Sequence, residues 1–506
     1  MQRQSKSTEV TSCAQHDNES ANANSIGGTM RVLIVSEAYR DDSLSANGTF
    51  GDIVTWIDYW TEFDDSLHIY VLVPEKKHVS WEDEFMRVDN PQVTILPATR
   101  AEDDNTLPGA RGLHTSELRT LAREVRSNYG YWDIVIDQRE IGRSVLTPFL
   151  NELVEASKAS VQPFELIDYV HDIATPSKHH GQWYPHEAMV KWEHANFTYA
   201  DRIWTKGGAD YDDMMENARN LFQYDVVDEI DQKAQIMHAP IDFSEMEEEY
   251  ADEPQYIHIA GDPGTPKRNP DTILDLIEFL YSRFNIKTIV TAPQDIPDEF
   301  VEPSFVEAYP NCTGEQYRKM LKKGDFYVYA SEFDASPRTM CEQAGHGQVA
   351  IYLDRSWLRY QVPDDYKLMS PDKSILKKLA AWTVKNWPAA ITEHKKMLSY
   401  MKERRDASTA AKEPYQDMKS MVDARVDDYS VGSWGEREIL EGAIESVGTP
   451  ATLKEIDEAS TQFTNKGNKL SELWTYNWAN VPFALRAMGY VDTGDSRVPA
   501  FTEAKS

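Results

Sequence analysis

Residues 324–354 constrain the fold more than any other part of this chain, because they combine strand, loop, helix and strand in immediate succession. The run 326–330 is apolar and aromatic, which is the pattern of a buried parallel strand. Ser336 and Pro337 suit a helix N-cap and a first helical position. Glycines at 345 and 347 then end the helix, and Val349–Leu353 is the next apolar run. The succession predicts an α/β fold with a parallel sheet.

The start of this helix is a natural site for an anion. The N-terminus of a helix at the carboxyl end of a parallel sheet offers free N–H groups and a positive dipole to phosphate. Two acids, Asp334 and Glu342, bracket that point and stand eight positions apart. An ordinary βαβ unit whose Glu342 is a solvated helix residue fits the same pattern. The segment alone therefore leaves both interpretations open.

This spacing resembles the donor-sugar motif of retaining glycosyltransferases of family 4, which have two facing Rossmann-like domains, the GT-B fold. The family motif is an acid, seven residues and Glu-Ala-x-Ala-x-Gly. Here Asp334 is followed by seven residues and by Glu342-Gln-Ala-Gly-His-Gly. The resemblance implies that Glu342 holds the nucleotide ribose, that Asp334 holds sugar hydroxyls, and that backbone amides near Ser336 and Arg338 hold the diphosphate. Because the first acid is Asp rather than Glu, we expect a shifted sugar contact.

A second segment agrees with this resemblance. Gly261 follows the apolar run Tyr256–Ala260, and Lys267 and Arg268 precede the next predicted helix. The family places a glycine and a cation at these points, because the departing nucleotide diphosphate gains negative charge in the transition state. The family's other basic residue, directly after the glycine, is Asp262 here, so Lys267 would supply the second charge. The alternative is a solvated loop pair.

The acceptor side of the site is expected in the first half of the chain. A glycine-containing loop after the first strand holds Gly48 and Gly51, and His171-Asp172 follows the strand Glu165–Val170. In the family such a His lies near the sugar or the acceptor, at the edge of the cleft between the domains. Most single histidines are structural, so that role for His171 is weighed against a packing role.

Alternating strands and helices divide the chain into domains. We expect a helix from Asp52 and first-domain strands at 32–36, 68–73, 93–96, 133–136, 165–170, 201–205 and 234–237. The predicted parts are a disordered leader (1–29), a Rossmann-like acceptor domain (30–243), a Rossmann-like nucleotide-sugar domain (254–405), a return helix (406–431) and a C-terminal domain (432–506). The family resemblance covers about residues 30–405.

Residues 432–506 differ from the rest. Helices are predicted at 436–447, from Thr449-Pro450 onward, and at 482–488, followed by a hairpin over 490–501. Three helices and a hairpin resemble a winged helix-turn-helix, and a helical appendage for packing or dimerisation is the alternative. The recognition part holds Lys466, Lys469, Arg486 and Arg497 against Glu472, Asp492 and Asp495, a net charge of only +1. That is poor for phosphate contact.

Composition limits the partners and the compartment. Asp and Glu outnumber Lys and Arg by 84 to 52, for a net charge of −32, so the surface repels nucleic acid and anionic membranes. Acidic excess along the whole chain is typical of salt-accumulating microbes or their viruses, and a merely acidic mesophilic protein is the alternative. Three cysteines build no disulfide framework, and neither a signal peptide nor a spanning segment is visible. A cytoplasmic location follows as an expectation.

The sequence therefore predicts a hexosyltransferase-type enzyme that uses a nucleotide-diphosphate sugar as donor and no cofactor. The histidines at 179, 180, 186 and 194 lack a recognisable ligand arrangement, so no metal is expected. The acceptor stays open among glycans, lipids, proteins, small molecules and modified DNA. Alternatives are a DNA-associated glycosyltransferase acting on modified bases, a sugar-nucleotide epimerase or phosphorylase, and a non-catalytic nucleic-acid-binding protein that uses 432–506.

The charge excess generates a first prediction. Added salt shortens the Debye length to about 3 Å at 1 M, which screens the self-repulsion of an acidic surface. We expect the melting temperature to rise steeply between low and molar KCl, measured by calorimetry. A melting temperature that stays flat or falls over this range would contradict adaptation to high salt.

Overall fold

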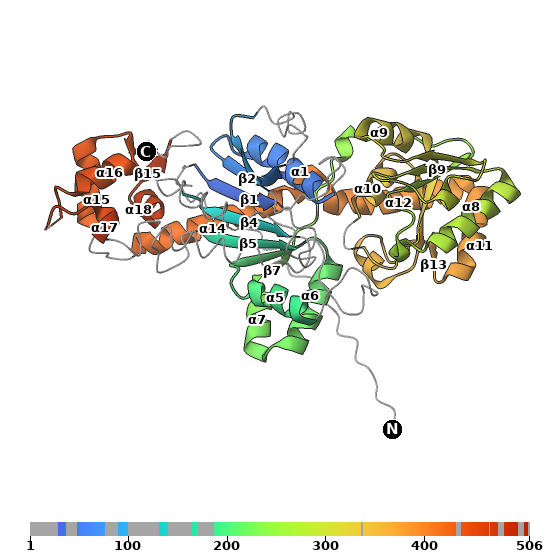
Figure 1. The fold of residues 1–506 in the computed structure, drawn as a ribbon, viewed down its shortest axis with the longest axis horizontal. Coiled ribbons are helices and arrows are strands. Elements are labelled where there is room, and N and C mark those ends of the chain that lie inside the picture. Colours follow the sequence, from blue (N-terminus) through green and yellow to red (C-terminus); the bar gives the residue numbers. More distant parts are fainter. Residues whose placement is uncertain are drawn as a thin grey trace, which may run out of the picture.

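A computed structural model of the chain describes residues 29–36, 48–75, 90–99, 131–139, 164–170, 187–334, 337–431, 437–464, 466–473, 480–493 and 500–503. Within these residues it contains two large parallel sheets and one small antiparallel sheet. Figure 1 shows the first sheet in the middle of an elongated molecule, the second sheet at one end and the small sheet at the other.

The first sheet has seven strands in the order β3-β2-β1-β4-β5-β6-β7, all parallel. Its strands are β1 (Arg31–Ser36), β2 (His68–Glu75), β3 (Val93–Thr99), β4 (Ile134–Arg139), β5 (Glu165–Val170), β6 (Arg202–Thr205) and β7 (Ala234–Ile236). The described helices are α1 (Gly48–Phe63), α5 (Glu187–Phe197), α6 (Gly208–Leu221) and α7 (Tyr224–Lys233). The central strands β1, β4 and β5 are buried over most of their length, as expected of strands covered on both faces, although Asp137, Gln138 and Asp168 interrupt the apolar runs of β4 and β5.

The second sheet has six parallel strands in the order β10-β9-β8-β11-β12-β13. Its strands are β8 (Tyr256–Ala260), β9 (Lys287–Thr291), β10 (Val306–Tyr309), β11 (Phe326–Tyr329), β12 (Val349–Leu353) and β13 (Met369–Ser370). Its helices are α8 (Pro270–Phe284), α9 (Gly314–Lys323), α10 (Arg338–Gly345), α11 (Lys373–Lys385) and α12 (Trp387–Arg405), with short 3₁₀ turns η2 (Phe243–Glu245), η3 (Pro266–Arg268), η4 (Asp298–Phe300) and η5 (Ser356–Tyr360). The prediction of two Rossmann-like domains is confirmed.

Two element starts differ from the sequence expectation. Helix α1 begins at Gly48 rather than Asp52, so Gly48 and Gly51 lie in its first turn and not in a loop. Burial explains the extension, because Trp56 and Trp60 of α1 are buried against the sheet and outweigh the low helix propensity of glycine. Helix α10 begins at Arg338, and Pro337 is its N-cap rather than its first helical residue.

The two segments that cross between the sheets lie side by side. Ile241, after β7, donates its N–H to the carbonyl of Arg405 at 2.8 Å, and Ala407 donates to the carbonyl of Ile241 at 2.9 Å. The Arg405 side chain is buried and donates to the Ala239 carbonyl at 3.2 Å, and its Nη1 lies 2.8 Å from Sγ of Cys341 on α10. One paired hinge therefore joins the domains and also contacts helix α10.

After the hinge, the chain returns to the first domain through α13 (Ala407–Ala410) and α14 (Lys412–Val431). The indole N–H of Trp60 donates to the Ala411 carbonyl at 2.7 Å, and that of Trp204 donates to the Asp417 carboxylate at 2.9 Å. Met418 and Met421 pack into the core of the first sheet. The return toward the first domain agrees with the expectation for residues 406–431.

The C-terminal part is a small module that contains α15 (Arg437–Val447), β14 (Ala451–Thr452), α16 (Leu453–Ser460), α17 (Leu470–Leu473), α18 (Val481–Ala487), β15 (Tyr490–Asp492) and β16 (Ala500–Glu503). Its strands form an antiparallel sheet in the order β14-β16-β15. The second predicted helix was placed too early, because β14 comes first and Thr452 then caps α16 with a reciprocal bond to Glu455. The winged-helix interpretation stays a prediction.

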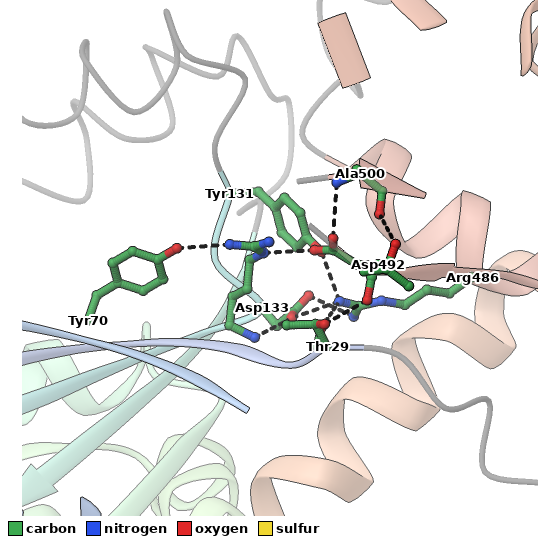
Figure 2. A network of polar contacts seen from close by, with 9 residues as sticks. Thr29, Tyr70, Tyr131, Asp133, Arg486, Asp492 and Ala500 are labelled. Atoms are coloured by element: carbon green, nitrogen blue, oxygen red, sulfur yellow. Dashed lines mark hydrogen bonds and ion pairs between the residues drawn. The ribbon is translucent and has the colours of Figure 1, made fainter. Parts of the chain in front are cut away.

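A buried network of charges fastens this module to the first domain (Figure 2). The guanidinium of Arg486 on α18 donates to both carboxylate oxygens of Asp133, at 2.8 and 3.0 Å. In the opposite direction, Nε of Arg31 on β1 donates to the Asp492 carboxylate of the module at 2.8 Å. The hydroxyl of Tyr131 donates to that same carboxylate at 2.7 Å. Two arginines and two aspartates, one of each from either side, thus neutralise one another.

This attachment lies at the amino ends of the strands. Arg31 begins β1 and Asp133 directly precedes β4, whereas ligand sites of parallel sheets lie at the carboxyl ends. The sequence analysis counted Arg486 among the cations that could contact DNA, and the structure corrects this. Arg486 is buried, as are its neighbours on α18 from Val481 to Leu485. Of the other basic residues, Lys466 is exposed and Arg497 lies outside the described residues. Among the described residues, none of the helices is long and apolar enough to cross a bilayer.

The network generates a stability prediction. The variant Arg486→Met leaves the Asp133 carboxylate buried without its cation, and such a loss costs about 3–5 kcal/mol. We expect the variant to unfold at clearly lower urea concentration, and a second change, Asp133→Asn, to recover part of the loss. Lys466→Met, which removes an exposed cation, is the control. A loss in Arg486→Met no larger than in Lys466→Met would contradict the assigned role.

Candidate active site

The carboxyl ends of the two sheets face each other across the hinge. Helices α1 and α10 follow β1 and β11, so both begin at these carboxyl ends, and their first turns meet: a Cβ on Gly51 would lie only 3.2 Å from the Arg338 guanidinium. Figure 1 places α1 and α10 at the adjoining ends of the two domains. The junction of these two helix starts is therefore a place where side chains of the two domains meet.

Arg268 and Gly261 lie together at the carboxyl end of β8. Gly261 has φ of +88°, a conformation that side chains disfavour, and a Cβ there would approach Nη2 of Arg268 to 2.9 Å. Arg268 donates to the Ala260 carbonyl at 2.8 Å and lies over the Tyr329 ring. Burial opposes the charge of Arg268, but Tyr329, Asp334 and Asp262 together raise its pKa. A permanently charged guanidinium thus stands in the cleft.

Asp334 lies at the end of β11, next to this cation. Its carboxylate accepts a hydrogen bond from the Tyr329 hydroxyl at 2.5 Å, and burial raises the pKa of Tyr329 well above its usual range, so the hydroxyl stays a donor. One Asp334 oxygen is bound in this way. The following residues, including Ser336, lie outside the described part of the chain.

Glu342 lies one turn into α10 and is held from two sides. Its carboxylate accepts from Nε of Arg338 at 3.0 Å and from the Tyr317 hydroxyl at 3.0 Å. Burial, together with Glu342, raises the pKa of Tyr317 well above its usual range, while Arg338 and Arg268 act in the opposite direction. Both arginines are therefore within electrostatic range of one tyrosine hydroxyl. The structure brings Arg268, Arg338 and Glu342 together, as the sequence implied.

Lys267 and Asp262 occupy less central positions. Lys267 is exposed on η3, and its carbonyl accepts the N–H of Glu332 at 2.8 Å. Asp262, which stands where the family has a base, accepts from the Gly264 N–H at 3.0 Å and from the Gln294 amide at 2.6 Å. This acid therefore shapes the turn after β8.

A small cavity opens beside Arg268, between β8 and β11. Its lining combines aliphatic side chains with a few polar groups, and consists of Ile259, Ala260, Pro263, Arg268, Ile273, Val328, Tyr329, Ala330, Ser331 and Gln343.

The first domain contributes an ion pair that the sequence analysis missed. Asp52, in α1, is fully buried, and its Oδ2 lies 2.9 Å from Nζ of Lys206, directly after β6. Its Oδ1 lies 3.4 Å from Nη1 of Arg338 in the second domain. The sequence shows Asp52 only as an acid in the first helix after β1. Its partners Lys206 and Arg338 are far away in the chain, so the pairing could not be recognised from neighbouring residues.

The structure describes only some of the residues predicted for the acceptor side. Gly48 begins α1, whereas His171 and Asp172 lie outside the described residues. Of the four histidines considered for a metal, His194 is described: it is buried, hydrogen-bonded to the carbonyls of Val190 and Met214, and has a pKa lowered by burial. No cluster of three or more potential metal ligands occurs among the residues that the structure describes.

A second contact joins the domains on the other side of the cleft. A Cβ on Gly208, at the start of α6, would overlap the ring of Tyr360 in η5. Asp212 of α6 binds both the Tyr360 hydroxyl and the Arg359 guanidinium. This contact is about half-exposed, whereas Asp52 is fully buried in its own ion pair.

Comparison with known proteins supports the fold. No protein-family model and no curated sequence matches the chain. Solved structures do match: TarM (TM-score 0.57, 8% identity, 78% of this chain and 99% of that one), HepE of Anabaena in complex with UDP (0.55, 10%, 77% and 100%) and OtsA (0.54, 11%, 77% and 99%). At such identities the likeness establishes the fold, which is the two-domain GT-B fold of glycosyltransferases.

The donor-site residues generate paired predictions. If Glu342 holds a ribose, Glu342→Ala should weaken nucleotide-sugar binding by roughly 1.5–3 kcal/mol, the worth of a charge-assisted hydrogen bond. Arg268→Ala should instead lower turnover, by about a hundredfold, because charge on the diphosphate grows as the glycosidic bond breaks. Calorimetry with the donor and a hydrolysis or transfer assay measure the two effects.

The exposed residues Glu278 and Arg283 of α8 provide matched controls as alanine variants. Near-normal binding in Glu342→Ala together with near-normal turnover in Arg268→Ala would contradict the donor-site assignment. Glu342 and Arg268 would then be solvated residues of an ordinary βαβ unit.

Proposed function

We propose that this protein is a glycosyltransferase that moves a hexosyl group from a nucleotide-diphosphate sugar to an acceptor, with retention at the anomeric carbon. The observation that carries the proposal is the grouping of Arg268, Glu342 and Asp334 at the carboxyl end of the second sheet of a GT-B fold. The matched structures include HepE bound to UDP and to UDP-glucose, which supports a nucleotide sugar as donor.

In the proposed mechanism each residue has a separate task. The Glu342 carboxylate binds the nucleotide ribose, and Asp334 accepts hydrogen bonds from sugar hydroxyls. The Arg268 guanidinium stabilises the diphosphate as the bond to the sugar breaks, with the free N–H groups at the start of α10 as further donors. Lys267, exposed on η3, adds positive charge at the mouth of the site.

The acceptor is proposed to approach from the first domain, past the first turn of α1 and the residues around His171. The C-terminal module is remote from this approach, because it is attached at the amino ends of the strands. We therefore propose a packing role for residues 437–503. The burial of Arg486 on α18 disfavours the alternative of a non-catalytic protein that binds nucleic acid through this module.

The proposal is tested by thermal unfolding with a panel of nucleotide sugars and matched free nucleotides. A ligand that binds the folded chain stabilises it, by about 2.7 kcal/mol at a hundredfold excess over its Kd. We expect one class of nucleotide sugar to raise the melting temperature, and the same donor to be hydrolysed slowly to free sugar and nucleoside diphosphate. Conversion of the donor to a different nucleotide sugar without an acceptor would instead identify an epimerase.

A phosphorylase would consume the donor only when phosphate is added. No stabilisation by any nucleotide sugar, with the chain folded, would reject the donor-binding role altogether.

A further inference from the structure

A chain of alternating charges crosses the cleft at the start of α10. It runs from Lys206 to Asp52 at 2.9 Å, from Asp52 to Arg338 at 3.4 Å and from Arg338 to Glu342 at 3.0 Å, with the Tyr317 hydroxyl on the far side of Glu342. Two cations and two anions are present, so the row is neutral as it stands.

The interdomain link is the longest of these contacts. Nη1 of Arg338 lies 3.4 Å from the Asp52 carboxylate and 3.4 Å from the Pro240 carbonyl, both of which lie outside α10. Nε of Arg338 lies 3.0 Å from Glu342 of the same helix. Separation of the domains would break the Asp52 contact and keep the Glu342 contact. The Asp52 contact is thus the one that can be exchanged for another anion.

A donor diphosphate is such an anion. Arg338 is the first residue of α10, at the helix start where the proposed function places the diphosphate, and a guanidinium binds phosphate oxygens with the same geometry as a carboxylate. Gly51 leaves the space in which the guanidinium lies, because a Cβ there would be 3.2 Å from it. The side chain therefore lies between Asp52 on one side and the donor site on the other.

We propose that Asp52 sets the donor affinity by competing with the donor diphosphate for the Arg338 guanidinium. In the free protein, the Arg338–Asp52 pair joins the domains. When the donor binds, Arg338 turns to the diphosphate, and Asp52 keeps Lys206 as its partner. This inference rests on the proposed function, since it needs a nucleoside diphosphate at α10.

The test measures binding of UDP, GDP and ADP by calorimetry, using whichever of them the wild-type chain binds. The key variant is Asp52→Asn with Lys206→Met, which removes one negative and one positive charge, so the local net charge does not change and no lysine is left buried without its carboxylate. We expect this double variant to bind the nucleoside diphosphate about fivefold more tightly than wild type, as removal of a partly buried competing ion pair allows.

Two further variants make the result specific. In an Arg338→Met background the Asp52 and Lys206 changes should have no effect on affinity, because the contested cation is missing. Asp212→Asn, which breaks the other interdomain pair, should leave the Kd within about twofold of wild type. Thermal unfolding without ligand confirms that each variant is folded, and the single variant Asp52→Asn replaces the double variant if the latter does not fold.

The outcomes separate this inference from the proposed function. A wild-type chain that binds none of the three diphosphates rejects the proposed function. If wild type binds one of them, equal or weaker binding by the double variant overturns the competition, and so does a gain that persists with Arg338→Met. Equal gains in Asp212→Asn would also overturn it, because general loosening of the domains would then be the cause.

Discussion

The arrangement of this molecule depends on the paired crossing segments between its two sheets. The chain leaves the first sheet after β7 and returns after α12, and Ile241 bonds to Arg405 and Ala407 at that one place. This pairing brings the carboxyl ends of the two sheets face to face. Because Arg405 also contacts Cys341 on α10 and the Ala239 carbonyl, the hinge and helix α10 are parts of one packed unit. The orientation of the domains and the position of α10 are thereby physically connected.

Opposite ends of the first sheet carry opposite kinds of interaction. At the amino ends, Arg31 and Arg486 face Asp133 and Asp492 in a buried network of paired charges. At the carboxyl ends, Asp52 and Arg338 meet at 3.4 Å across two domains. The first arrangement suits a permanent attachment, since loss of either partner strands a buried charge. The second suits a contact that forms and breaks as the cleft changes.

Sequence reasoning predicted the elements that depend on neighbours in the chain. The apolar runs of β5, β8 and β12 agree with the structure to the residue, because short apolar stretches between polar residues mark buried strands. Gly261 and Arg268 were found through their order along the chain, and the structure places them in contact.

Three of the missed features involve distant partners. Asp52 is an ordinary acid in the sequence, and nothing near it indicates Lys206 or Arg338. Arg486 was counted as a DNA-contacting cation because its charge was visible, while Asp133, 353 positions away, was not recognisable as its partner. Helix α1 was begun too late because the burial of Trp60 beneath α14 is a tertiary effect. In each case packing between remote segments outweighed the local signal.

The attachment of the C-terminal module has a consequence for biosynthesis. The second domain is built from one continuous stretch, so all its strands and helices are available once the hinge has been made. The first domain, although it is translated earlier, needs α14 to cover Trp60 and Trp204, and needs Arg486 and Asp492 to neutralise Asp133 and Arg31. Domains generally fold as units as the chain emerges from the ribosome. Here the order is expected to be reversed, with the later domain complete first and the earlier one finished only after α14 and the C-terminal module have been made.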